Sequence, residues 1–142
     1  HWGEVHVKNF GLERAEHISP AGTACALEMP FTFHQDSPVI PPNMLEIVWC
    51  AVNRRTKTGR VLGEGEKIST LEALKAVTRY AAYQYFEEDR KGSLAEGKAA
   101  DFVILGQDPL AVDPMELRNI PVLETIKDGR TIWLCGRKDE NT

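Results

Sequence analysis

The sequence predicts an α/β fold in which a helical part with one buried strand is followed by a small β unit. Three observations lead to this expectation. Between residues 19 and 38, a helix signal, a proline and a short apolar segment follow one another, which is the order of an α/β unit. Two further helix-capping signals precede residue 90. The strand signals between residues 91 and 134 include an Asp-Gly hairpin turn.

Length and composition are those of a single globular domain. The chain has 142 residues, of which 42% are apolar and 27% charged, and a chain of this size buries roughly two-thirds of its unfolded surface. The net charge of −4 gives no basic footprint for nucleic acid, and no apolar run approaches the length of a membrane span. The first residues lack the pattern of a signal peptide.

The cysteines indicate the redox compartment. Cys25, Cys50 and Cys135 are far apart and include no Cys-x-x-Cys pair. An odd number of widely spaced cysteines predicts reduced thiols and therefore a cytoplasmic protein. Zinc-finger spacing is absent.

The N-terminal segment, residues 1–11, has neither a helical nor a strand period and predicts a loop that ends at Gly11. His6 lies in this segment, and two interpretations of it remain open. It is either a residue of a functional site or an isolated surface histidine, because no second ligand stands at metal-binding spacing from it.

Three helices are predicted between residues 19 and 86. A Ser-Pro pair at the start of residues 19–28 gives a cap and a proline at the first helical position. Asn43 caps a helix over residues 43–55, whose apolar residues recur at i, i+3 and i+4. A capping box that begins at Ser69 opens a third helix over residues 69–86.

The segment Phe31–Pro38, Phe-Thr-Phe-His-Gln-Asp-Ser-Pro, predicts a short strand that ends in a polar turn. Strand alternation places Phe31 and Phe33 on one face and His34 and Asp36 on the other. A carboxylate just past the end of a buried strand is where barrel enzymes carry catalytic groups. Asp36 is therefore a candidate catalytic residue. The alternative is that its carboxylate accepts backbone N–H bonds in the turn, as Asp often does.

The β unit begins with residues 102–105, Phe-Val-Ile-Leu, a continuous apolar run typical of a strand covered on both faces. Residues 122–127 and 130–134 predict two more strands. Asp128-Gly129 joins them and is the strongest short signal for a hairpin turn.

Four stretches of the chain carry a common resemblance: Trp2–His6, Leu12–Ala15 with Ile18–Pro20, Phe31–Val39 and Lys91–Val103. They resemble the C-terminal part of the metal-dependent amidohydrolase superfamily, in the subgroup that includes N-substituted formamide deformylase. The last stretch, Lys-Gly-Ser-Leu-Ala-Glu-Gly-Lys-Ala-Ala-Asp-Phe-Val, is specific to that superfamily. Together the four stretches extend over nearly all of the chain.

The resemblance implies the last units of a (β/α)8 barrel in residues 1–90 and return strands of a flanking β-sandwich in residues 91–142. It also implies hydrolysis of carbon–nitrogen bonds in small, non-peptide amides or formamides, with a divalent metal, zinc being expected, in the full-length enzyme. Asp36 would bind that metal and carry a proton from the attacking water to the leaving nitrogen. His34 is expected to support Asp36. His6 matches a motif position whose role the resemblance does not define.

The chain also departs from that family pattern. It lacks the His-x-His pair of the first barrel strand, and a catalytic zinc normally needs three protein ligands, while a closed barrel takes about 250 residues. We therefore expect a piece of a larger enzyme, inactive alone and without tightly bound metal. The alternative is a non-catalytic module whose exposed strand edges are covered by a second copy, giving a homo-oligomer, or by a partner chain. Neither nucleic acid nor a membrane is an expected partner.

Overall fold

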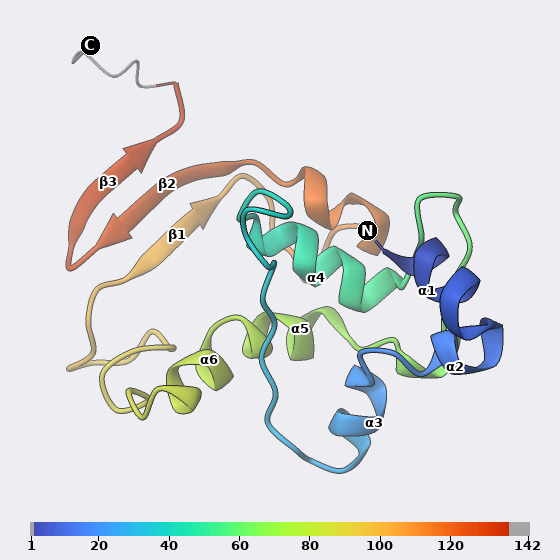
Figure 1. Cartoon of the computed structure of the whole chain (residues 1–142). Helices are drawn as coiled ribbons and strands as arrows, with labels where there is room; N and C mark the ends of the chain where they lie inside the picture. The colour runs from blue at the N-terminus through green and yellow to red at the C-terminus, as the bar shows by residue number, and fades with distance from the viewer. Residues whose placement is uncertain (1, 137–142) are drawn as a thin grey trace.

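The computed structural model describes residues 2–136. Helices form most of the regular secondary structure in this range, and a three-stranded antiparallel sheet of order β1-β2-β3 extends from one end (Figure 1). The α-helices are α1 (Gly3–Phe10), α2 (Leu12–Glu16), α3 (Ala21–Ala26), α4 (Met44–Asn53), α5 (Thr70–Ala76) and α6 (Arg79–Gln84). The 3-10 helices are η1 (Glu64–Glu66) and η2 (Pro114–Asn119), and the strands are β1 (Phe102–Leu105), β2 (Val122–Lys127) and β3 (Arg130–Leu134).

This mixture of helices and strands agrees with the expected fold class in its coarse form. Residues 2–136 do not close a barrel, and the strands that they form belong to one small antiparallel sheet. No helix among these residues is long and apolar enough to cross a membrane.

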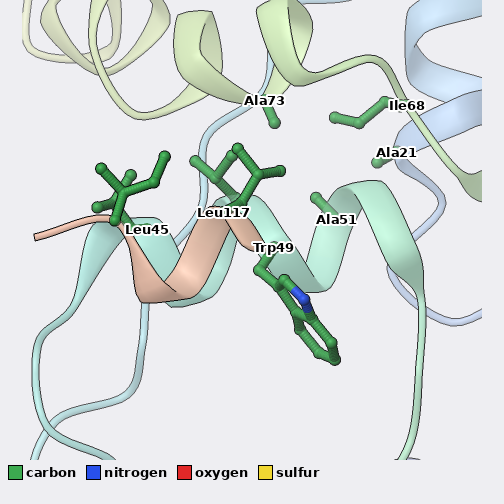
Figure 2. Close-up of a cluster of buried hydrophobic side chains, with 9 residues drawn as sticks. Ala21, Leu45, Trp49, Ala51, Ile68, Ala73 and Leu117 are labelled. Carbon is green, nitrogen blue, oxygen red and sulfur yellow. The ribbon is translucent and has the colours of Figure 1, made fainter. Parts of the chain in front are cut away.

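Helix α4 occupies the centre of the helical part, as its apolar periodicity predicts. The Asn43 side chain accepts hydrogen bonds from the backbone N–H groups of Leu45 and Glu46 at 3.1 and 3.3 Å, which confirms the predicted cap. Figure 2 shows the buried side chains that gather around α4 and η2. The core cluster consists of Ala21, Leu45, Val48, Trp49, Ala51, Ile68, Ala73, Leu117 and Ile120.

The 3-10 helix η2 is attached to α4 by both apolar and polar contacts. Trp49 donates from Nε1 to the carbonyl oxygen of Met115 at 2.9 Å, and Asn53 donates to that of Pro114 at 2.8 Å. The Arg118 guanidinium lies 4.0 Å from the centre of the Trp49 ring, a cation–π distance. Leu117 is fully buried. Residues before and after position 90 therefore share one hydrophobic core.

The prediction of a loop over residues 1–11 was wrong, because this segment forms α1 and the start of the following connection to α2. Tertiary contacts hold α1. The Glu4 carboxylate accepts hydrogen bonds from the hydroxyls of Thr56 and Thr58 at 2.7 and 2.5 Å. Gly3 lies so close to Thr56 that a Cβ atom at Gly3 would stand 2.6 Å from the threonine methyl group. These partners are about fifty positions away, so no local pattern announces the helix.

Two predicted helices are shorter than expected. The first is confined to α3 and has no side-chain cap, since Ser19 stands outside it with a φ of 49°. The third divides into α5 and α6 at Thr78. The Thr78 hydroxyl donates to the carbonyl oxygen of Leu74 at 2.7 Å, and its N–H bonds to Lys75 instead. The hydroxyl thus takes the acceptor that a continuous helix would use. Ser69 does cap α5, accepting from the Glu72 N–H at 3.2 Å.

The predicted strand at the start of Phe31–Pro38 was also wrong, because within residues 2–136 this segment pairs with no other strand. A strand needs a neighbour to accept its backbone hydrogen bonds. Phe31 and Phe33 nevertheless share one face of the segment, as the alternation predicts, although no neighbouring strand is present in the described range. Phe31 and Phe33 are half-buried against the core and meet edge to face, with 5.3 Å between ring centres. The segment is therefore held by its side chains.

The C-terminal sheet confirms the three predicted strands. In the turn between β2 and β3, Asp128 and Gly129 have φ values of 48° and 73°, as a type I′ hairpin requires. The expectation that both faces of β1 are covered was wrong for residues 2–136, because Val103 and Ile104 are 51% and 41% exposed. Trp133 is also exposed on β3, so this sheet presents apolar side chains to solvent.

Replacing Gly129 by valine is expected to destabilise the hairpin. The residue has a φ of +73°, and a side chain in the left-handed region costs about 1–2 kcal/mol, more when it is β-branched. Thermal denaturation should show a melting temperature several degrees lower. Gly65→Val is the control, because a Cβ atom at Gly65 meets nothing within 4 Å and its φ is not positive. Equal melting temperatures for Gly129→Val and the unmodified chain would contradict the proposed strain.

Candidate functional site

Asp36 lies at the start of the loop that connects the Phe31 segment to α4. Its backbone has a φ of 56° and its side chain is exposed. The backbone N–H of Asp36 donates to Nδ1 of His34 at 3.1 Å, and its carbonyl oxygen accepts from the Val39 N–H at 2.8 Å. Among residues 2–136, the carboxylate has neither a hydrogen-bond nor an ion-pair partner. The carboxylate therefore does not accept the backbone bonds that the turn-stabilising alternative requires.

His34 contacts the backbone of Asp36 and not its carboxylate. Because Nδ1 accepts the Asp36 N–H bond, the proton of the neutral ring is on Nε2. The ring is exposed. His34 thus stabilises the left-handed turn at Asp36 and leaves the carboxylate free.

Gln35, which the sequence interpretation did not single out, is the buried member of this segment. Only 7% of the residue is exposed. Its side-chain Nε2 donates to the carbonyl oxygen of Asn43 at 2.6 Å, and its Oε1 accepts the Asn43 N–H. This pair of bonds closes the intervening loop in the way that a backbone bridge would. The sequence offers a polar residue between His and Asp but no periodicity that indicates a buried clamp.

The structure does not bring His6 to Asp36. His6 stacks on Phe10 within α1, with ring centres 5.8 Å apart and an angle of 12°. Glu4 ties α1 to Thr56, which follows the C-terminal end of α4, whereas the Asp36 loop precedes the N-terminal end of α4 (Figure 1). Helix α4 has ten residues and is therefore about 15 Å long. His6 and Asp36 thus lie toward opposite ends of α4.

The Asp36 carboxylate could supply one ligand to a divalent metal. An exposed carboxylate without a partner is the ligand type that zinc and similar ions take. Nevertheless, residues 2–136 contain no group of three or more His, Cys, Asp or Glu side chains able to hold a metal ion. A cavity of ≈ 450 Å³ lies beside α6, lined by Pro30, Arg79, Tyr80, Tyr83, Glu88, Asp89, Ser93 and Lys98. Asp36 is not part of its wall.

Glu66 and Arg54 form a second polar group, and it braces the fold. The Glu66 carboxylate accepts from the Thr23 hydroxyl at 2.6 Å and from the Thr23 N–H at 2.8 Å, which lowers the pKa of Glu66. Arg54 donates to the carbonyl oxygens of four residues: Leu62, Ser19, Ile18 and Glu16. Burial lowers the pKa of this guanidinium. The Glu66 contacts tie α3 to η1. The Arg54 contacts tie the residues before α3 and Leu62 to the end of α4.

Replacing Glu66 by glutamine is expected to destabilise the protein near neutral pH, because one of its two acceptor oxygens becomes a donor facing Thr23. The folded-state pKa of Glu66 lies below its ordinary value of 4.5. The carboxylate therefore contributes stability that is fully present above pH 4.5 and is lost as the pH falls through the folded-state pKa. The difference in melting temperature between the unmodified protein and Glu66→Gln should shrink below pH 4.5.

Glu64→Gln is the matched control for Glu66→Gln. Glu64 belongs to the same 3-10 helix, but its side chain is exposed and pairs with Lys67 at the surface. Exposed pairs of this kind contribute about 0–1 kcal/mol. The contrary result is that the melting temperatures of the unmodified protein and Glu66→Gln differ by the same amount at every pH. That result would show that the ionised form of Glu66 is not what stabilises α3.

Comparison with known proteins relates this chain to a family of hydrolases. Residues 3–133 match the family described as the amidohydrolase family. N-substituted formamide deformylase of Arthrobacter pascens is 32% identical over 130 residues, which are 90% of this chain and 24% of the relative. "Putative amidohydrolase YtcJ" of Bacillus subtilis (strain 168) is 32% identical over 101 residues, which are 69% of this chain and 19% of the relative. The chain thus spans a quarter or less of these relatives' lengths. No solved structure is significantly similar to it.

Proposed function

Because the chain belongs to the amidohydrolase family, we propose that it is the C-terminal part of a hydrolase that cleaves carbon–nitrogen bonds in small, non-peptide amides or formamides. In this proposal residues 1–90 provide the last units of a (β/α)8 barrel and residues 91–142 the return strands of a flanking β-sandwich. The observation that carries it is the Asp36 carboxylate, exposed and without a partner among residues 2–136. The name of the deformylase relative supports the substrate class.

Asp36 has two tasks in the proposed enzyme. It supplies one ligand to a divalent metal, expected to be zinc, which lowers the pKa of water so that hydroxide exists near neutral pH. It also accepts the proton of the attacking water on a carboxylate oxygen and delivers that proton to the leaving nitrogen. An acceptor with this role must be ionised and free of competing hydrogen bonds. His34 supports it by bonding to the backbone of Asp36, which leaves both carboxylate oxygens available.

The metal content of the full-length protein tests the proposal. We expect one or two divalent ions per chain, hydrolysis of N-substituted formamides or amides, and loss of that activity on treatment with a chelator. The 142-residue chain alone should neither hydrolyse these substrates nor bind zinc stoichiometrically, because tight binding needs several ligands held together. A metal-free, inert full-length protein would overturn the proposal. Nanomolar zinc binding by the short chain that Asp36→Ala abolishes would show that it assembles a site of its own.

The exposed sheet supports a second candidate function, that of a non-catalytic module that associates with itself or with a partner chain. Val103 and Trp133, from the two outer strands, both expose apolar side chains. The edges of such a sheet also present unpaired backbone groups. Sedimentation of the chain over a range of concentrations tests this candidate: association should grow with concentration, and a folded monomer at high concentration would argue against it.

A further inference from the structure

We infer that Gln35 is a positioning residue that sets the direction of the Asp36 carboxylate. This inference rests on the proposed function, because it concerns the residue that carries the proton. It assigns a role to a side chain that neither the sequence interpretation nor the family resemblance identifies. Gln35 acts through Asp36 and does not itself touch the reacting atoms.

A series of contacts connects the hydrophobic core to Asp36. Leu45 and Val48 anchor α4 in the buried cluster. Asn43 is fixed to the first turn of α4 by its cap bonds to the N–H groups of Leu45 and Glu46. The Gln35 amide then bonds to both backbone groups of Asn43, its N–H and its carbonyl oxygen. Asp36 follows directly in the chain, so its Cα position is set by this clamp.

The carboxylate of Asp36 depends on its backbone for direction. Among residues 2–136 it has no hydrogen-bond partner that would orient it. Its backbone stands at a φ of 56°, in the left-handed region that non-glycine residues rarely adopt. Such a conformation persists only where the surroundings determine it. The loop supplies three other restraints: the Asp36 N–H donates to His34, the Asp36 carbonyl oxygen accepts from the Val39 N–H, and the Ser37 hydroxyl donates to the carbonyl oxygen of Ile40. The bonds of His34 and Ser37 are exposed.

Burial makes the Gln35 clamp the dominant restraint. At 7% exposure, the amide has almost no access to water, so both of its polar atoms need the partners that Asn43 provides. Exposed bonds such as that of Ser37 exchange readily with water. Losing the clamp therefore leaves the start of the loop free to shift, and a displacement of about 1 Å at a catalytic group can cost roughly 10²-fold in rate.

The test compares three substitutions in the full-length enzyme, and Asp36→Asn serves as the reference for loss of the carboxylate. Gln35→Met keeps the length of the side chain and removes both bonds; Gln35→Asn keeps the amide but is one methylene shorter, so that it cannot make both bonds to Asn43 as Gln35 does. Gln84→Met is the matched control, because Gln84 accepts one hydrogen bond from Thr32 at 2.7 Å at the other end of the same segment. We expect kcat to fall roughly 10- to 100-fold in Gln35→Met, less in Gln35→Asn, and not in Gln84→Met.

The pattern of kinetic constants separates positioning from folding. With metal content unchanged and assays run well below the melting temperature, Gln35→Met should lower kcat while KM stays within about twofold, since substrate binding does not involve the clamp. If Gln35→Met does not fold, the intermediate kcat of Gln35→Asn carries the test. An unchanged kcat in a folded Gln35 variant overturns the inference but leaves the function intact if Asp36→Asn is inactive. Full activity of Asp36→Asn would overturn the inference together with the role proposed for Asp36, and it would leave the proposed hydrolase activity standing.

Discussion

Replacing Asp36 by asparagine in the full-length enzyme is expected to lower turnover by about 10²–10⁴-fold, the usual contribution of a general acid–base group. Asparagine has the same shape and tolerates the left-handed backbone at Asp36, where φ is 56°. The carboxylate has no bond to other residues in the range 2–136 that the change would break. The substitution therefore removes the charge and the proton acceptor, and steady-state kinetics with an amide substrate will measure the loss.

Asp89→Asn provides the control for this change. Asp89 is also an exposed aspartate without an ion-pair partner among the described residues, but it stands in the turn after α6. Its replacement should leave turnover within about twofold, because surface changes of this kind usually alter little. Near-normal turnover in Asp36→Asn would show that the Asp36 carboxylate is not needed for the reaction. A loss of metal together with turnover would indicate that its role as a ligand dominates.

Local chemistry predicted the elements that depend on neighbours in the sequence. Asn43 caps α4 because its acceptor is within three residues of the N–H groups that it satisfies. Asp128 and Gly129 form the hairpin turn because their positive φ values need only these two residues. Interactions over such short distances are visible in the sequence itself.

The elements that the sequence misassigned depend on distant partners. Helix α1 is fixed by Glu4 bonds to Thr56 and Thr58, which the amino-acid pattern around Glu4 does not indicate. The Phe31 segment has strand-like alternation, but pairing requires a neighbouring strand that residues 2–136 do not supply. Periodicity reports which side chains can share a face, and it does not report whether a backbone partner is present.

The candidate site combines a local signal with a distant contact, and the role of Asp36 stays a prediction. The position of Asp36 between an aromatic segment and prolines pointed to a carboxylate with a special role. The sequence does not indicate the Gln35 clamp, because the two partners of the Gln35 amide are backbone atoms of Asn43, eight positions away. A glutamine in a polar turn is ordinarily exposed, so only the fold reveals that this one is buried.

Replacing Trp49 by alanine is expected to destabilise the chain by about 3–5 kcal/mol, as truncation of a buried tryptophan does. This is a large part of the roughly 5–15 kcal/mol that stabilises a typical domain. Trp49 is 5% exposed and belongs to the core cluster. It also donates to the carbonyl oxygen of Met115 and lies under the Arg118 guanidinium. The substitution leaves a cavity and removes the hydrogen bond to Met115 and the cation–π contact with Arg118, two of the contacts that attach η2 to α4.

Trp133→Ala is the matched control, because it removes the same side chain from a residue that is 47% exposed on β3. Urea unfolding of both variants and of the unmodified chain should give a clearly smaller loss of unfolding free energy for Trp133→Ala. A lower m-value for Trp49→Ala would indicate that η2 has already left the folded state, since m follows the surface exposed on unfolding. Equal losses of unfolding free energy for the two variants would contradict the central place of α4 and η2. The buried Trp49 would then contribute no more to stability than the exposed Trp133.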